Sequence, residues 1–336
     1  MSATNATGFG STRESLRKLS IKIRTAVGSA DSLTKIVNTK KKLSLKLGLL
    51  AISVMTTFAG LAIGQASSPT SLATVRTEKL ASKLMGREMP YRIILPPTYS
   101  KENSSERFPV VYLLHGLTGH YDNWTDKTRV ARLTGSADFI IVTPEGEDGW
   151  YTDSATKPND KYDSYIVKEL IPEVDKKYRT IADRDHRAIA GLSMGGFGSL
   201  KFGLKYPEMF VLAGSFSGAL GAASITEKNF PGAIGKTIDA IFGPDGSDVR
   251  KANDPFAIVR SATPDQIRKF PFLYLDCGTE DFLFQNNREF DSLLIEKKVS
   301  HEFRELPGAH NWIFWDAQVE EFLQVAAKHI GTVSKP

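Results

Sequence analysis

A serine between glycines, Ser193 in the stretch AGLSMGG, has the setting in this chain that most directly indicates chemistry. An apolar run, RAIAGL, precedes it and a helix-like segment follows, so we expect Ser193 at a sharp strand-to-helix turn. Gly191 and Gly195 would leave room for that turn, because its backbone is strained and packs closely against neighbouring strands. A serine hydroxyl is a poor nucleophile near neutral pH and needs an imidazole to accept its proton. The motif therefore predicts a nucleophile only if a base and an acid accompany it.

We expect the base and the acid at the ends of two later strands. His310 lies in a Gly-Ala-His loop after the run FREL, and three acidic residues, Asp276, Glu280 and Asp281, lie in FLYLDCGTEDFLF. We prefer Asp281 as the acid because Asp276 falls inside or at the end of the strand, with Asp276 and Glu280 as alternatives. In this scheme the carboxylate orients His310 and stabilises its imidazolium form. The order serine, acid, histidine along the chain is that of α/β-hydrolases.

An oxyanion formed during acyl transfer needs two hydrogen-bond donors. The first expected donor is the backbone amide of Met194, the residue after the serine. The second is the amide of Leu117 in the stretch LLHGLTGHYDNW, where Gly116 lets the chain turn after a strand. We interpret His115 in the same loop as a residue that supports the oxyanion loop.

Four aromatic residues lie in loops near the expected strand ends and are candidates to line an acyl or alcohol pocket, with core packing as the alternative: Trp124, Trp150, Tyr151 and Trp312. We expect no metal, because the chain lacks an H-E-x-x-H pattern and has a single cysteine, Cys277. The proposed chemistry also needs no organic cofactor.

These residues require a fold that brings strand ends together. Five continuous apolar runs read as strands that are covered on both faces, as in a parallel sheet: FPVVYLLHG, ADFIIVTPEG, HRAIAGLS, MFVLAGSFSG and FPFLYLDCG. Amphipathic segments alternate with them, which predicts an α/β fold with a mostly parallel central sheet flanked by helices. Residues 219–270 are rich in Gly, Pro, Asn and Asp, and we interpret them as an inserted helical segment over the strand ends.

Six stretches in this order resemble the putative-esterase family of α/β-hydrolases, which includes tributyrin-type and feruloyl esterases, S-formylglutathione hydrolases and, more distantly, mycolyltransferases. The matching stretches are LLHGLTGHYDNW, VTPEGEDGWYTDS, YIVKELIPEVDKKYRT, AGLSMGGFGSLKFGLKYPEMF, DCGTEDFLFQNNREF and GAHNWIFWDAQVEEFL. The resemblance runs from about Arg76 to Ile330. It implies the α/β-hydrolase fold, with Ser193, Asp281 and His310 as the triad and Leu117 and Met194 as the oxyanion donors.

Charge and hydropathy divide the chain into a leader and a main domain. Residues 1–66 hold ten basic and two acidic residues of a chain with net charge +5, so the remainder carries −3 and nucleic acid is not an expected partner. A basic run precedes the apolar residues 47–63, and small residues follow at 64 and 66, which is the order of a signal peptide. We therefore predict a leader at 1–66, a linker at 67–74, and an esterase domain at 75–332. The protein would be secreted or periplasmic, with an uncleaved membrane anchor or an organelle transit peptide as alternatives.

Together these patterns predict a serine hydrolase that cleaves carboxylic esters through an acyl-enzyme intermediate. The expected substrates are short-chain acyl esters, or acetyl or feruloyl esters, on small molecules or on polysaccharide. An acyltransferase similar to mycolyltransferases, or a thioesterase of the S-formylglutathione type, would use the same triad. A non-catalytic binding protein is the alternative that the intact triad argues against.

Overall fold

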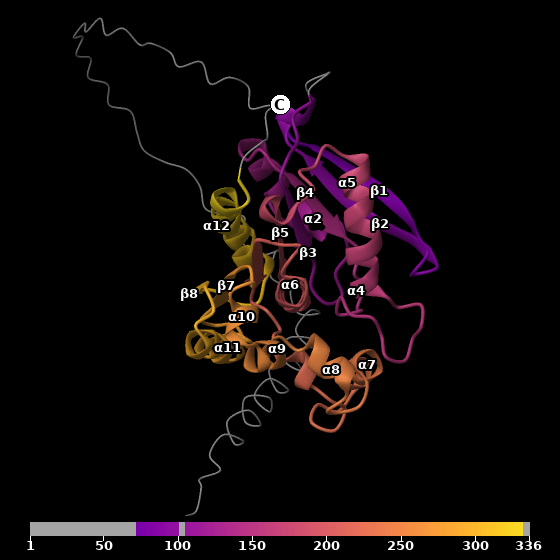
Figure 1. The fold of residues 1–336 in the computed structure, drawn as a ribbon, viewed down its shortest axis with the longest axis vertical. Coiled ribbons are helices and arrows are strands. Elements are labelled where there is room, and N and C mark those ends of the chain that lie inside the picture. The colour runs from indigo at the N-terminus through magenta and orange to yellow at the C-terminus, as the bar shows by residue number, and fades with distance from the viewer. Residues whose placement is uncertain (1–71, 101–104, 332–336) are drawn as a thin grey trace, which may run out of the picture.

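A computed structural model describes residues 72–100 and 105–331 and contains a central eight-stranded sheet (Figure 1). The strand order across the sheet is β1-β2-β4-β3-β5-β6-β7-β8. All neighbours from β4 to β8 pair in parallel, and β1 and β2 add an antiparallel hairpin at one edge. The strands are β1 (Thr74–Ser82), β2 (Arg87–Leu95), β3 (Val110–Leu114), β4 (Ile140–Pro144), β5 (Arg187–Leu192), β6 (Leu212–Phe216), β7 (Phe272–Gly278) and β8 (His301–Leu306).

The central strands are buried along their whole length, which explains why their sequences are continuously apolar. Their register aligns the loops that carry the candidate site. Leu114 at the end of β3 lies opposite Gly191 of β5, and Leu192 of β5 lies opposite Phe216 of β6. The loops after β3 and β5 therefore leave the sheet at the same edge, as the parallel arrangement requires.

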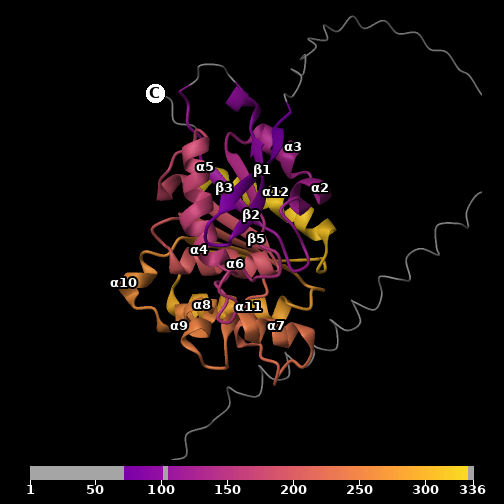
Figure 2. The ribbon, with the colours of Figure 1, turned by 90° about the vertical axis from the view of Figure 1, so that its right-hand side faces the viewer.

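Helices cover both faces of the sheet and bury two apolar cores (Figure 2). One face is covered by α4 (Tyr162–Tyr165), α5 (Ile171–Lys177), α6 (Met194–Lys205) and α11 (Phe284–Lys297). The other face is covered by α2 (Asn123–Lys127), α3 (Val130–Leu133) and α12 (Trp312–His329). A π-helical turn at Ile166–Leu170 joins α4 to α5, so the three form one continuous helical segment. The predicted α/β-hydrolase architecture is confirmed.

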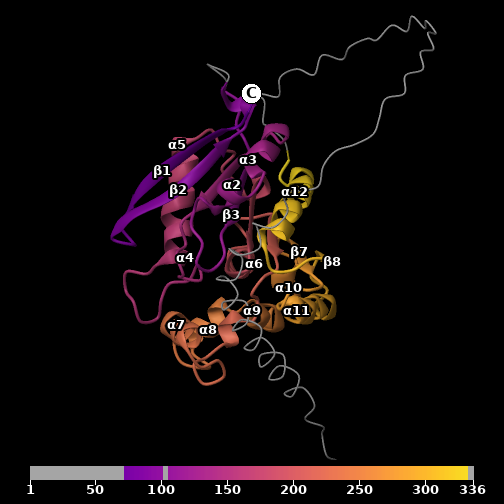
Figure 3. The same cartoon turned by 180° about the vertical axis from the view of Figure 1, so that it is seen from behind.

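The segment between β6 and β7 forms the inserted helical region that the sequence predicts. It contains α7 (Ala233–Phe242), α8 (Asp248–Asn253), α9 (Pro255–Ser261) and α10 (Pro264–Ile267), which lie together at one end of the sheet (Figure 3). The buried Arg250 side chain holds this region together: its guanidinium donates to the carbonyl oxygens of Ala223 and Ile225, both at 2.7 Å, and pairs with Asp239 of α7.

The predicted leader at 1–66, its apolar stretch at 47–63 and most of the 67–74 linker lie outside the described residues. Within residues 72–100 and 105–331, no helix has the length and apolar character needed to cross a membrane.

Candidate active site

Ser193 occupies the turn between β5 and α6 in a backbone conformation that is rare for a residue with a side chain. Its φ is 53° and its ψ is −114°, and its amide donates to the Phe216 carbonyl oxygen at 2.9 Å. The flanking glycines are required by close packing. A Cβ atom on Gly191 would lie 2.5 Å from the backbone of Gly195, and one on Gly195 would lie 2.4 Å from the Leu114 carbonyl oxygen. This geometry is that of a nucleophile elbow, which exposes the serine hydroxyl above the sheet edge.

A continuous hydrogen-bond chain joins Ser193 to His310 and Asp281. The Nε2 atom of His310 lies 3.0 Å from Oγ of Ser193, and its Nδ1 atom lies 2.8 Å from Oδ2 of Asp281. In the neutral imidazole that can act as a base, Nδ1–H donates to the carboxylate and Nε2 accepts from the serine hydroxyl. The structure thus brings together three residues that are 88 and 29 positions apart in the sequence, at the ends of three different strands.

Asp281 and His310 are held in place by further contacts. The Asp281 side chain is buried, and its Oδ1 atom accepts from the Leu283 amide at 2.8 Å. The His310 ring packs against two aromatic rings, with centroids 4.6 Å from Phe282 and 4.9 Å from Trp315. These contacts favour an imidazole orientation in which Nε2 faces the serine hydroxyl and Nδ1–H faces the carboxylate.

The two alternative acids occupy different surroundings. Asp276 lies inside β7, is fully buried, and both of its carboxylate oxygens lack a hydrogen-bond partner among the described residues. Burial raises the pKa of Asp276 well above its ordinary value, with Tyr274 and Arg304 counteracting only in part. Glu280 is exposed to solvent. Only Asp281 of the three contacts His310.

The two expected oxyanion donors flank the serine. Met194 is the first residue of α6, so its amide has no partner within the helix. A Cβ atom placed on Gly116 would lie 3.4 Å from Cβ of Ser193, which places the loop after β3 directly beside the serine. The Leu117 amide in this loop donates to no other group among the described residues. The next residue, Thr118, has a φ of 61° and donates its amide to Oδ1 of Asp148 at 2.7 Å, which fixes the loop in this shape.

His115 supports the oxyanion loop from the side of the core. Its Nδ1–H donates to the Gly116 carbonyl oxygen at 2.8 Å, and its Nε2 atom lies 3.2 Å from Oε1 of Glu145. Burial alone would raise the pKa of Glu145, but hydrogen bonds and charge interactions with His115, the Glu147 amide and His120 lower it to about 2. Glu145 is therefore a carboxylate at neutral pH. Among the described residues, no group of three or more His, Cys, Asp or Glu side chains could hold a metal ion.

Ser193 and His310 open into a cleft with a volume of about 690 Å³. Its walls come from the oxyanion loop, α2, α7 and the start of α12. The lining residues are Gly116, Leu117, Thr118, Gly119, Asn123, Lys127, Asp148, Trp150, Leu192, Ser193, Ala233, Ile234, Thr237, Phe282, His310, Asn311, Trp312 and Trp315. The inserted segment thus contributes one wall through α7.

Two of the four aromatic candidates, Trp150 and Trp312, line this cleft. Trp124 does not line it. Its side chain is fully buried, and its indole N–H donates to the Leu114 carbonyl oxygen at 3.0 Å. Tyr151 is likewise fully buried and points into the core. We therefore assign Trp124 and Tyr151 to packing rather than to direct substrate contact.

Sequence reasoning missed Phe282, Trp315 and Ile234 as lining residues. Phe282 directly follows the candidate acid, and Trp315 lies one helical turn after Trp312, so both had a positional signal. Ile234 had none, because nothing in its local sequence shows which side of α7 faces the cleft.

The model of the family described as "Putative esterase" matches residues 82–324, which is more than half of the chain. The chain belongs to this esterase family. This esterase is 28% identical over 256 residues to an acetyl esterase of Caldicellulosiruptor saccharolyticus, covering 74% of this chain and 96% of that protein. It is 25% identical over 271 residues to S-formylglutathione hydrolase of Mus musculus, covering 72% and 89%. A solved structure of a ferulic acid esterase superimposes with a TM-score of 0.67 at 29% identity, covering 77% of this chain and 99% of that one.

These likenesses confirm the predicted family and class of activity. The esterase is a carboxylic ester hydrolase on the α/β-hydrolase fold.

Proposed function

We propose that this esterase cleaves carboxylic esters by covalent catalysis on Ser193. The observation that carries the proposal is the continuous hydrogen-bond chain from Oγ of Ser193 through His310 to Asp281, positioned in the cleft. Leu117 lines the same cleft, and Met194 follows Ser193 directly at the first position of α6, so the amides of these two residues are the proposed donors to an oxyanion. Among the described residues, no other serine is hydrogen-bonded to a histidine that is itself bonded to a carboxylate.

The reaction follows from these positions. Oγ of Ser193 attacks the ester carbonyl carbon while its proton passes to Nε2 of His310, and Asp281 stabilises the imidazolium. The negative charge that develops on the carbonyl oxygen is stabilised by the Leu117 and Met194 amides. When the carbon–oxygen ester bond breaks, His310 protonates the leaving alcohol and an acyl-serine remains. Water then attacks the acyl-serine with His310 again as the base, which releases the carboxylic acid and restores Ser193.

The cleft supports esters of modest size with an apolar or aromatic part. Trp150, Trp312 and Trp315 line it together with Phe282, and its volume is in the range of small-molecule sites. Such walls would pack against a short acyl chain or a single ring. Relatives named acetyl esterase and ferulic acid esterase agree with both options. We therefore propose short-chain acyl, acetyl or feruloyl esters, free or linked to polysaccharide, as substrates.

We also propose that the protein is exported. The support is the order of a basic run, the apolar residues 47–63 and small residues at 64 and 66. A mature N-terminus at Ser67 in the secreted or periplasmic fraction would support cleavage. An intact leader in the membrane fraction would instead indicate an anchored protein.

The test of the catalytic assignment is turnover of p-nitrophenyl acetate by the purified protein and by Ser193→Ala, above the rate without enzyme. We expect Ser193→Ala to lose roughly 10⁴–10⁶-fold in kcat. Unchanged turnover would overturn the assignment. A panel of acyl lengths with methyl ferulate and acetylated xylan would rank the substrates. Products formed with an added acceptor alcohol would reveal acyl transfer, and matched oxygen and sulfur esters would reveal a thioesterase.

A further inference from the structure

Two adjacent aromatic residues beside the cleft have left-handed backbones. Trp150 has a φ of 51° and Tyr151 has a φ of 52°, values that are uncommon for bulky residues. Both lie in the loop between β4 and α4. Such a conformation persists only where the surroundings hold it, and it often occurs at functional sites.

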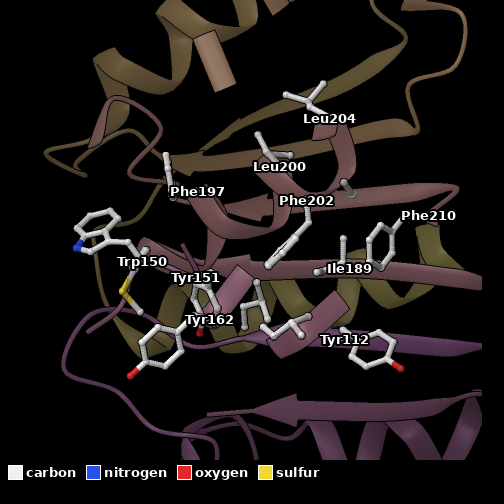
Figure 4. Close-up of a cluster of buried hydrophobic side chains, with 14 of the residues drawn as sticks. Tyr112, Trp150, Tyr151, Tyr162, Ile189, Phe197, Leu200, Phe202, Leu204 and Phe210 are labelled. Atoms are coloured by element: carbon white, nitrogen blue, oxygen red, sulfur yellow. The ribbon is translucent and has the colours of Figure 1, made fainter. Parts of the chain in front are cut away.

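This loop sends the two side chains to different places (Figure 4). Trp150 lines the cleft and packs edge-on against Phe197, with ring centroids 5.6 Å apart. Tyr151 enters the core, and its hydroxyl donates to the His115 carbonyl oxygen at 2.9 Å. His115 directly precedes Gly116 and Leu117, so the Tyr151 hydroxyl supports the base of the oxyanion loop.

The group that holds this loop is the ammonium of Lys201 in α6, the helix that begins directly after Ser193. The Lys201 side chain is completely buried. Its Nζ atom donates to the Tyr151 carbonyl oxygen, lies 3.4 Å from Oγ1 of Thr152, and pairs with Oδ2 of Asp163 at 2.7 Å. A buried lysine is costly and is retained only where its donors are satisfied. Here they are satisfied by the strained loop and its counter-ion.

We propose that Lys201 is a positioning residue for catalysis, which fixes the Trp150–Tyr151 turn and thereby sets both the cleft wall and the oxyanion loop. This proposal rests on the proposed function of Ser193 and the Leu117 amide. The mechanical connection runs from α6 through the Tyr151 carbonyl to the Tyr151 hydroxyl, and from there to the His115 carbonyl. One helix therefore carries the nucleophile at its start and fixes the oxyanion donor through its second turn.

Lys205 provides a matched control one helical turn later. Its Nζ atom also pairs with Oδ2 of Asp163, at 3.0 Å, and donates to Oδ1 of Asn253, but it makes no hydrogen bond to Tyr151 or Thr152, and its side chain is 30% exposed. Removing Lys205 therefore weakens the same ion-pair network without releasing the turn. Tyr151→Phe tests the next step of the connection, because it keeps the Lys201 contacts and deletes only the hydroxyl that reaches the His115 carbonyl.

The experiment compares Lys201→Met, Tyr151→Phe and Lys205→Met in the full-length protein. Active sites are counted with a fluorophosphonate, and kcat and KM for p-nitrophenyl acetate are measured per active site, with the thermal unfolding midpoint alongside. We expect kcat to fall at least about tenfold in Lys201→Met and severalfold in Tyr151→Phe. Complete loss of an oxyanion donor costs roughly 10²–10³-fold, which sets the upper limit for both variants. KM for this small ester stays within about twofold, and Lys205→Met retains the wild-type kcat. The double variant Lys201→Met/Tyr151→Phe loses less than the product of the two single effects.

A purely structural role for Lys201 predicts a lower unfolding midpoint with an unchanged kcat per active site, and that result overturns the proposal. An equal loss of kcat in Lys205→Met also overturns it, because the ion pair rather than the turn would then matter. If Lys201→Met does not fold, Tyr151→Phe decides, and an unchanged kcat in that variant contradicts the proposal. Failure of the proposed function would be visible separately, as a wild-type protein that the fluorophosphonate does not label.

Discussion

His310 lies 2.8 Å from Asp281 through its Nδ1 atom, on the side of the ring opposite the atom that faces Ser193. The carboxylate thus fixes the tautomer in which Nε2 is free to accept the serine proton. Asp276, only five residues earlier, lies within β7 and has no hydrogen-bond partner among the described residues. The same substitution should therefore reduce catalysis at Asp281 and leave it nearly unchanged at Asp276.

We predict that Asp281→Asn lowers kcat by roughly 10³–10⁴-fold, because an amide favours the wrong imidazole tautomer. Asp276→Asn should retain a kcat close to that of the wild type, and its free energy of unfolding near neutral pH should be equal or higher, because it removes an unpaired buried acid. Steady-state kinetics with p-nitrophenyl acetate and urea unfolding measure both effects. A large loss of kcat in Asp276→Asn with a small loss in Asp281→Asn would reverse the assignment.

The α7 wall should limit the size of the ester. Ile234 lines the cleft, so Ile234→Trp should lower kcat/KM for methyl ferulate by about tenfold or more while retaining most activity on methyl acetate. The physical reason is lost volume beside the reacting serine. Ile295→Trp, at an exposed position on α11, is the matched control and should change neither value. Equal effects on both esters would show that α7 does not set size selectivity.

Arg250 should control both stability and the shape of that wall. Arg250→Met leaves the carbonyl oxygens of Ala223 and Ile225 without their donor and Asp239 without its charged partner. We expect a loss of about 3 kcal/mol in the free energy of unfolding, and a raised KM for bulky esters because α7 loses its attachment. Chemical denaturation and KM for methyl ferulate test the two parts. An unchanged KM would show that Arg250 stabilises the inserted segment but does not determine the shape of the cleft.

Acid should destabilise the protein through Glu145 and Asp163. Burial raises both pKa values, but His115 in the first case and Lys201 with Lys205 in the second lower them to about 2, below the ordinary values of 4.5 and 3.8. Because the folded-state pKa is the lower one, the stability from each carboxylate is complete above its ordinary pKa and is lost as the pH falls through about 2.

The variant Glu145→Gln tests this direction of the change in stability with pH. Its free energy of unfolding should be lower than that of the wild type near neutral pH, and the difference should shrink as the pH falls from 4.5 towards 2. Urea denaturation over this range gives the comparison, with the exposed Glu280→Gln as the control. A difference that is constant over the whole range would show that the Glu145 charge contributes nothing.

The prediction of the triad rests on strand ends: Ser193 and Asp281 follow continuous apolar strands, and His310 follows β8, whose sequence HEFREL is mostly polar. In a parallel sheet all such strand ends meet at one edge, so the chain order of Ser193, Asp281 and His310 carries spatial information. The choice of Asp281 over Asp276 followed from strand length alone, and its contact with His310 is the geometric support for it.

The residues that line the cleft could not be predicted as well from the sequence. Trp124 and Trp312 both lie in loops or helix starts near strand ends, yet the first is fully buried and the second lines the cleft. That difference depends on how α2 and α12 pack against each other, which no local pattern encodes. The contact of Lys201 with Tyr151 joins positions 50 residues apart, and a lysine on a helix most often points to solvent. Its burial becomes visible only in the folded chain.

The acyl-enzyme itself gives the most direct test of the central claim. The protein is mixed with p-nitrophenyl acetate, quenched in acid during the first turnovers, digested and analysed by mass spectrometry. The account predicts one added acetyl group on the peptide that contains Ser193, and no such adduct in Ser193→Ala. An acetyl group on a different residue, together with undiminished turnover by Ser193→Ala, would contradict it.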